Sequence, residues 1–238
     1  GDAARDIVVG DNGKATFDDL GVLIDIRTTI ANIGGADLIS TGAGPDVVLG
    51  GSAADLINAG EDDGEDVILG DNGLALFDSV AGQSVLRTIQ TSDPADGAGD
   101  VIAAGNGSDV VLGGSGDDAI DAGFDAARDI VIGDNGQALF DEAGVLISIG
   151  TTDPAIGGDD DILVGDGDDV VLGGIGADYI NVDRLTQTNL GVDEGVDVVL
   201  GDNGFARFDA VAGQSVLRSI ETSDVQHGGD DFIYTDDG

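Results

Sequence analysis

Short apolar runs recur along the chain, and each follows an aspartate and precedes a glycine-rich stretch. The aspartates that begin these runs lie nine residues apart in three series, and the second residue after each is aliphatic. The series are Asp37, Asp46 and Asp55; Asp100, Asp109 and Asp118; and Asp160, Asp169 and Asp178. Apolar runs this short, bounded by glycines, predict brief β-strands joined by tight turns.

Two classes of predicted strand alternate along the chain. In one class all three residues are apolar, as in 47–49; in the other the third residue is polar or alanine, as in 38–40. Because side chains alternate across a strand, the first class carries apolar side chains on both faces. We expect its outward stripe to be covered, either by hairpins of this chain or by a neighbouring chain. The stripe comprises Val47, Leu49, Val67, Leu69, Val110, Leu112, Ile130, Ile132, Val170, Leu172, Val198 and Leu200.

A longer repeat contains these strands. The tetrapeptide Gly-Asp-Asn-Gly begins at Gly10, Gly70, Gly133 and Gly201, each time after an apolar run. The residues that follow, such as 14–26, are typical of a hairpin. Residues 2–8 recur at 125–131, and residues 80–87 recur at 211–218, which indicates duplication of a two-unit block. The sequence therefore predicts one segment, 1–238, of units 6–65, 66–128, 129–196 and a truncated 197–238, cut from a longer array.

The charge requires cations. The chain has 48 acidic and 8 basic residues, a net charge of -40, with 42 glycines and no cysteine among 238 residues. Such self-repulsion opposes a compact state unless cations neutralise it. It also argues against nucleic acid and anionic membranes as partners. No apolar run is long enough for a membrane span, and the 41% hydrophobic content argues against a disordered acidic chain.

The nine-residue pattern, seen most clearly at 50–58, 105–112, 113–121 and 165–172, matches G-G-x-G-x-D-x-U-x. The chain thus resembles the hemolysin-type calcium-binding repeats of RTX proteins. The resemblance implies an all-β fold: a calcium-stapled, right-handed parallel β-roll or β-helix solenoid, here with hairpin elaborations in each unit of about 60 residues. Calcium takes six to eight oxygen ligands, which aspartates and glycine-turn carbonyls can supply.

The resemblance also implies a set of calcium ligands. Two nine-residue units close one coil, so aspartates about 18 residues apart share an edge. The expected pairs are Asp37 with Asp55, Asp46 with Asp66, Asp100 with Asp118, Asp109 with Asp129, Asp160 with Asp178, and Asp169 with Asp197; Asp6 and Asp231 occupy the same repeat position. The expected turn glycines are Gly42, Gly44, Gly51, Gly105, Gly107, Gly114, Gly116, Gly165, Gly167, Gly174 and Gly176.

The Gly-Asp-Asn-Gly turns depart from this pattern, because their aspartate is at the second position and alanine is at the sixth. We interpret Asp11, Asp71, Asp134 and Asp202 as ligands or edge caps. The alternative is that Asp-Asn-Gly is simply favourable turn chemistry.

No catalytic set emerges. His227 is the only histidine and lies in a predicted turn, and acidic pairs arise from composition alone. We therefore expect a non-enzymatic, calcium-binding structural module of a large extracellular or surface protein, such as a stalk, adhesin or matrix component, that folds on calcium after type I secretion from a Gram-negative bacterium. Two alternatives stay open: an accessory calcium domain of a secreted enzyme or toxin, and a module that self-associates, laterally or end to end, through its apolar sheet face.

Overall fold

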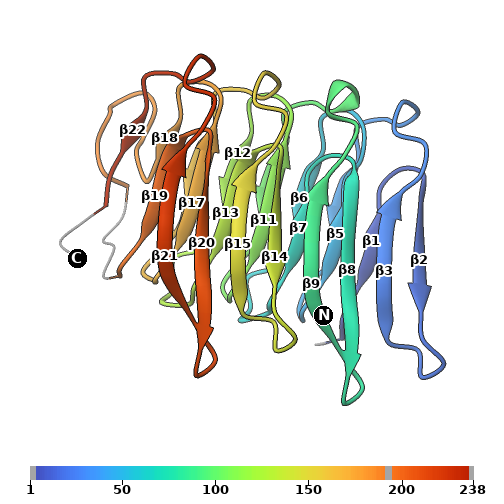
Figure 1. Cartoon of the computed structure of the whole chain (residues 1–238). Coiled ribbons are helices and arrows are strands. Elements are labelled where there is room, and N and C mark those ends of the chain that lie inside the picture. The colour runs from blue at the N-terminus through green and yellow to red at the C-terminus, as the bar shows by residue number, and fades with distance from the viewer. Residues whose placement is uncertain (1–3, 191–194, 236–238) are drawn as a thin grey trace.

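The computed structural model describes residues 4–190 and 195–235, and these residues are almost entirely β-structure. They form three sheets (Figure 1). The inner sheet is parallel and contains β1 (Ile7–Val9), β5 (Val47–Leu49), β7 (Val67–Leu69), β11 (Val110–Gly114), β13 (Ile130–Asp134), β17 (Val170–Gly174) and β19 (Val198–Asp202). The outer sheet is also parallel and contains β4 (Leu38–Ser40), β6 (Leu56–Asn58), β10 (Val101–Ala103), β12 (Ala119–Asp121), β16 (Asp161–Leu163), β18 (Tyr179–Ile180) and β22 (Phe232–Ile233).

The third sheet, the hairpin sheet, is antiparallel. It contains β2 (Gly13–Phe17), β3 (Leu23–Thr28), β8 (Gly73–Val80), β9 (Gln83–Thr91), β14 (Gly136–Phe140), β15 (Leu146–Thr151), β20 (Gly204–Val211) and β21 (Gln214–Thr222). The short 3-10 helix Pro94–Asp96 lies in the loop after β9. No helix among the residues described could cross a membrane.

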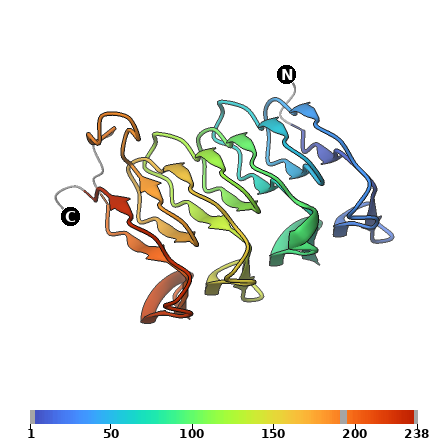
Figure 2. The same cartoon turned by 90° about the horizontal axis from the view of Figure 1, so that it is seen from above.

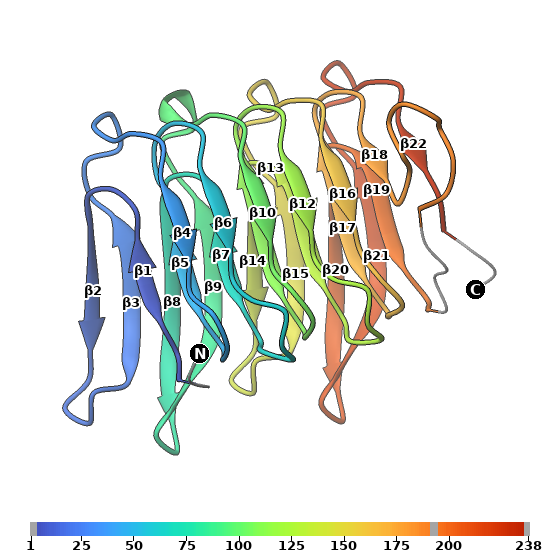
Figure 3. The same ribbon diagram turned by 180° about the vertical axis from the view of Figure 1, so that it is seen from behind.

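The two parallel sheets form because the chain passes repeatedly from one to the other (Figure 3). Neighbouring strands pair in register, so that Val48 lies beside Ile68 and Ile68 beside Val111. These middle residues all point between the two sheets and are buried there with Ile57, Ile102 and their equivalents. All-β structure with parallel sheets is consistent with the predicted β-roll.

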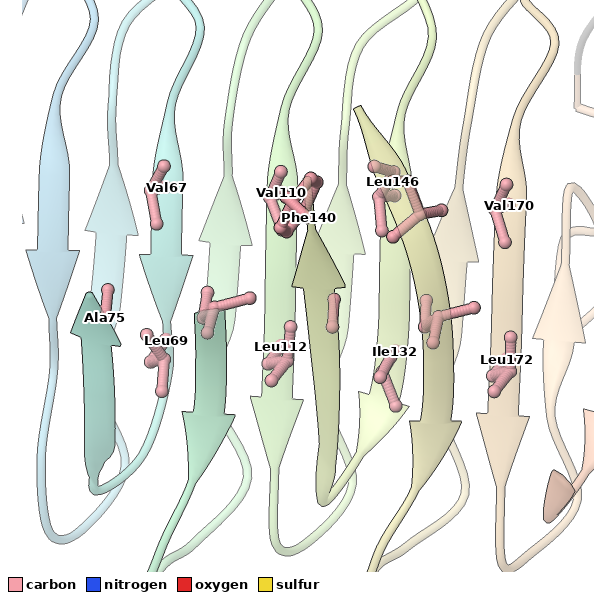
Figure 4. Close-up of a cluster of buried hydrophobic side chains, with 14 of the residues drawn as sticks. Val67, Leu69, Ala75, Val110, Leu112, Ile132, Phe140, Leu146, Val170 and Leu172 are labelled. Carbon is pink, nitrogen blue, oxygen red and sulfur yellow. The ribbon is translucent and has the colours of Figure 1, made fainter. Parts of the chain in front are cut away.

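The apolar stripe of the inner sheet is covered by the hairpins of the same chain. Phe77, Phe140 and Phe208 of the hairpin sheet are buried in one cluster with the stripe, of which Val198 alone is only partly buried. Figure 4 shows Phe140 with Leu69 and Leu112 in this cluster. The expectation that the stripe is covered is confirmed, and the hairpins cover it. Because this face lies within the molecule, it is not a surface for self-association, and that part of the expectation is wrong.

The hairpins also join one another, which the sequence did not predict. Strand β3 pairs with β8, β9 with β14, and β15 with β20, all antiparallel. A hairpin is two strands wide, and so is a pair of neighbouring coils, because strands in any sheet lie about 4.8 Å apart. One hairpin on every second coil therefore builds a continuous third layer (Figure 2). This match of widths explains why the unit contains two coils and about 60 residues.

Candidate metal sites

Two columns of aspartates run along the molecule. The inner column precedes the inner-sheet strands: Asp6, Asp46, Asp66, Asp109, Asp129, Asp169 and Asp197. The outer column precedes the outer-sheet strands: Asp37, Asp55, Asp100, Asp118, Asp160, Asp178 and Asp231. In each column the Oδ1 atom of one aspartate accepts the backbone N–H of its neighbour on the preceding coil. Asp109 accepts from Asp66 at 2.8 Å, and Asp118 accepts from Asp100 at 2.6 Å.

The structure brings the two members of every expected pair together. Each pair is joined by one such hydrogen bond, for example Asp37 N–H to Asp55 Oδ1 at 2.7 Å and Asp169 N–H to Asp197 Oδ1 at 3.0 Å. The other four are 46–66, 100–118, 109–129 and 160–178. Asp66 follows Asp55, and Asp129 follows Asp118, by 11 residues instead of nine, so the turns between them are two residues longer. These longer turns do not interrupt the inner column. The loop before Asp197 includes residues outside the described ranges, yet Asp197 still joins the column.

The second carboxylate oxygen of many column aspartates is buried and has no hydrogen-bond donor within the described chain. These Oδ2 atoms belong to Asp37, Asp46, Asp55, Asp100, Asp109, Asp118, Asp160 and Asp178. A charged oxygen cannot stay buried without compensation, so it must hold either a proton or a cation. Burial, with neighbouring carboxylates adding to it, raises the pKa of Asp100 to about 8 and places that of Asp118 well above its ordinary value.

Glycine backbones bring further oxygens to the outer column. A methyl group built on Gly113 would overlap both Asp118 Oδ2 and the carbonyl oxygen of Gly133 on the next coil. The same two kinds of oxygen meet at Gly50, Gly70, Gly133 and Gly173. Each cradle is therefore lined by one carboxylate and one peptide carbonyl, the hard oxygen donors that Ca²⁺ prefers. These residues fit calcium.

Side-chain clusters play no part in this arrangement. Nowhere in the described residues do three or more His, Cys, Asp or Glu side chains gather as a metal-binding group. A cation would therefore be held by single carboxylates on neighbouring coils together with turn carbonyls. Carbonyls also line the inner column, where the carbonyl oxygen of Gly60 faces Gly105, and that of Gly105 faces Gly123.

The aspartates of the Gly-Asp-Asn-Gly turns are placed differently. Asp71 accepts the N–H of Ala98 on Oδ1 at 3.0 Å and that of Ser115 on Oδ2 at 2.6 Å. Asp11 and Asp134 use both oxygens in the same way, and Asp202 accepts from Gly229. These hydrogen bonds tie the start of each hairpin-bearing turn to its returning end and, for Asp11, Asp71 and Asp134, to the turn of the next coil, as an edge cap would.

The register shows how such a turn arises. Asp134 lies beside Gly114, and Asp202 beside Gly174, so the aspartate takes the place of the second turn glycine. The chain then leaves for the hairpin and returns to complete the turn. Sequence reasoning missed this interruption, and it also missed the first turn glycines that form the cradles. Their signal was present, because a glycine follows every apolar run of the inner sheet.

The expected turn glycines divide into two groups. Nine have positive φ, from +105° at Gly116 to +130° at Gly174, as the sequence argument requires. Gly165 and Gly167 are not among them; a side chain there would strike the backbone of the preceding coil at Phe124 and Ala127. His227 lies in an exposed loop, where its carbonyl accepts the Asn203 side chain at 2.7 Å.

Calcium-free protein should lose β-structure as the pH rises. Burial raises the pKa of Asp66 to about 8 and that of Asp129 to about 9 in the folded chain, whereas an unfolded aspartate titrates near ~3.9. Between these values the folded state binds more protons, so its stability is greatest at acid pH and declines as pH rises through about 8 to 9. Circular dichroism in chelator measures this. Calcium-saturated protein is the control and should change far less; a signal in chelator that is flat with pH would contradict the prediction.

The comparisons with known proteins agree with this geometry. The family model of the RTX calcium-binding nonapeptide repeat (4 copies) matches residues 33–64, 95–128 and 155–184. No curated protein and no solved structure matches the chain. Each matched segment contains aspartates of both columns, and none includes a strand of the hairpin sheet. These three segments match RTX calcium-binding repeats, a repeat type that binds several Ca²⁺ ions.

Proposed function

We propose that the chain is a calcium-stapled structural module of a large extracellular protein, a stalk, adhesin or matrix component, and that it folds when calcium binds after secretion. The observation that carries this is the set of buried Oδ2 atoms without donors in a chain of net charge -40. Calcium supplies positive charge between the coils. Because the unfolded chain has no assembled sites, the free energy of binding becomes free energy of folding.

The ions would lie between coils along both columns. On the outer column we assign Asp118 Oδ2 with the carbonyl of Gly133, and Asp178 Oδ2 with that of Gly201, as partial ligand sets. On the inner column the aspartates would combine with turn carbonyls. RTX repeats typically occur in secreted proteins, and type I export from a Gram-negative bacterium fits a chain that stays unfolded at low cellular calcium. An accessory role beside a catalytic or toxin domain elsewhere in the protein is the alternative.

One observation supports side-by-side association as a second function. Five of the eight basic residues lie on the hairpin sheet, namely Lys14, Arg27, Arg87, Arg207 and Arg218. The acidic residues of the same strands are Asp25, Asp78, Asp209 and Glu221, so the strands of this sheet are nearly neutral in a strongly acidic molecule. A second copy would meet the least repulsion there. Sedimentation in calcium at several protein concentrations measures the association.

The test of the main proposal is a calcium titration of chelated protein, followed by far-UV circular dichroism with magnesium as the control. We expect a cooperative change from coil to β-structure at about 10⁻⁴ to 10⁻³ M calcium, the range of extracellular modules, and little change with magnesium. Full β-structure in chelator at neutral pH would contradict the proposal, because the two apolar layers would then support the fold unaided.

A further inference from the structure

Five asparagines of this chain precede a glycine: Asn12, Asn72, Asn106, Asn135 and Asn203. Asn-Gly is chemically labile, because glycine leaves its own backbone nitrogen free to approach the asparagine side chain. That nitrogen bonds to the side-chain Cγ, the Cγ–Nδ2 bond breaks, and ammonia leaves with the displaced proton. Water then opens the resulting five-membered imide to aspartate or isoaspartate. The sequence gives all five pairs the same reactive dipeptide, so differences between them must come from the structure.

Three of the five pairs combine burial of the asparagine with hydrogen bonds on both reacting groups. Asn72, Asn135 and Asn203 are buried, and each following glycine begins a strand of the hairpin sheet. The Asn135 amide donates to Ser115 Oγ at 2.9 Å and to the carbonyl of Ile156 at 3.1 Å. The N–H groups of Gly73, Gly136 and Gly204 donate to threonine hydroxyls of the preceding hairpin at 3.0 to 3.1 Å.

Asn106 is placed differently. It lies in a turn of the inner column, partly exposed, between Gly105 at φ +108° and Gly107 at φ +126°. Its amide makes one hydrogen bond, at 3.2 Å, to the exposed carbonyl of Glu61. The Gly107 N–H donates to a carboxylate, Asp125 Oδ2, at 2.8 Å. Both reacting groups are hydrogen-bonded here too, but water reaches the Asn106 side chain, and the bond to the Glu61 carbonyl is the one restraint on its amide among the described residues.

We propose that Asn106–Gly107 is the deamidation site of the folded protein, and that the hairpin-bearing turns protect Asn72, Asn135 and Asn203. Asn12 is intermediate, because its amide donates to the Ile33 carbonyl at 2.6 Å but its turn is partly exposed. Reaction at Asn106 adds a carboxylate, and in the isoaspartate product an extra backbone carbon, to a turn that bridges to Asp63 on the neighbouring coil.

Peptide mapping by mass spectrometry tests the proposal. Calcium-saturated protein is aged in mildly alkaline buffer, and a parallel sample is aged in urea. In the folded sample we expect Asn106 to convert at least about tenfold faster than Asn72, Asn135 or Asn203, because those must wait for local opening. In urea the pairs should convert at similar rates. The Asn106→Gln variant should lose the fast phase and keep the slow one.

Two results would overturn the proposal. One is that the buried pairs convert as fast as Asn106 in folded protein. The other is that the pairs keep the same order of conversion rates in urea, because the local sequence and not the fold would then explain that order. Circular dichroism of the aged samples shows whether they are folded. The order of deamidation rates depends on the folded structure and not on what stabilises it. A protein that stays folded in chelator would therefore contradict the proposed calcium function but would leave this test valid.

Discussion

Gly133→Ala should raise the calcium concentration at the folding midpoint by about tenfold or more, which corresponds to about 1.4 kcal/mol or more. The added methyl group would overlap Asp160 Oδ2 and lie 2.9 Å from the Gly173 carbonyl oxygen. It would therefore fill the oxygen cradle itself. Because Gly133 is not among the residues with positive φ, the change adds no backbone strain. Calcium titration followed by circular dichroism gives the midpoint.

Two matched alanine variants separate loss of the cradle from crowding. Gly35→Ala meets nothing within 4 Å and should leave the midpoint unchanged. Gly136→Ala crowds the Ile132 side chain and not a carboxylate, so it should lower resistance to urea in saturating calcium with a smaller shift in the calcium midpoint. Equal midpoint shifts for Gly133→Ala and Gly136→Ala would argue that the cradles do not bind calcium.

Asp109→Ala and Asp109→Asn should both weaken calcium-dependent folding, again by about tenfold or more in midpoint. Asp109 is fully buried, its Oδ1 accepts the Asp66 N–H at 2.8 Å, and its Oδ2 is among the buried oxygens without a donor. Asparagine keeps the Oδ1 acceptor but removes the charge and places N–H donors where calcium needs an oxygen. Calcium titrations followed by circular dichroism give the midpoints, and thermal melts at fixed calcium compare the melting temperatures of the variants.

The control for this pair is Glu142→Ala, which alters an exposed hairpin turn away from both columns and should change the melting temperature little. If Asp109→Asn melts like the unmodified protein, the column needs only its hydrogen bonds. If Glu142→Ala costs as much as Asp109→Ala, general charge and not the column governs the calcium response.

The aspartate columns could be predicted because their cause is local. A period of nine residues fixes one aspartate, one inward aliphatic residue and one turn, so Asp100 and Asp118 had to meet on neighbouring coils. The covered stripe followed in the same way, from apolar residues on both faces of one strand class.

The pairing between hairpins could not be predicted in this way. Arg27 lies beside Leu74, far along the chain, and the hairpin pattern at either residue is the same whether the two strands meet or stand apart. Nor could the choice between cap and ligand be made for Asp71, because it depends on which N–H groups reach its carboxylate. Here these are the N–H of Ala98, in the loop that returns from the hairpin, and that of Ser115, on the next coil. The local sequence pattern predicts which strands form. How neighbouring hairpins pair depends instead on the equal widths of a hairpin and a pair of coils.

That common width has a mechanical consequence for a module that carries load along its axis. The hydrogen bonds of all three sheets run along this axis, so a pull on the ends loads successive coils in series and opens them one after another. Each hairpin straps two coils together, so the yielding element is the pair. Two coils occupy about 10 Å of folded length, whereas their ~60 residues extend to about 200 Å. Under load the module would therefore lengthen in large steps of similar size, one for each pair of coils that unfolds.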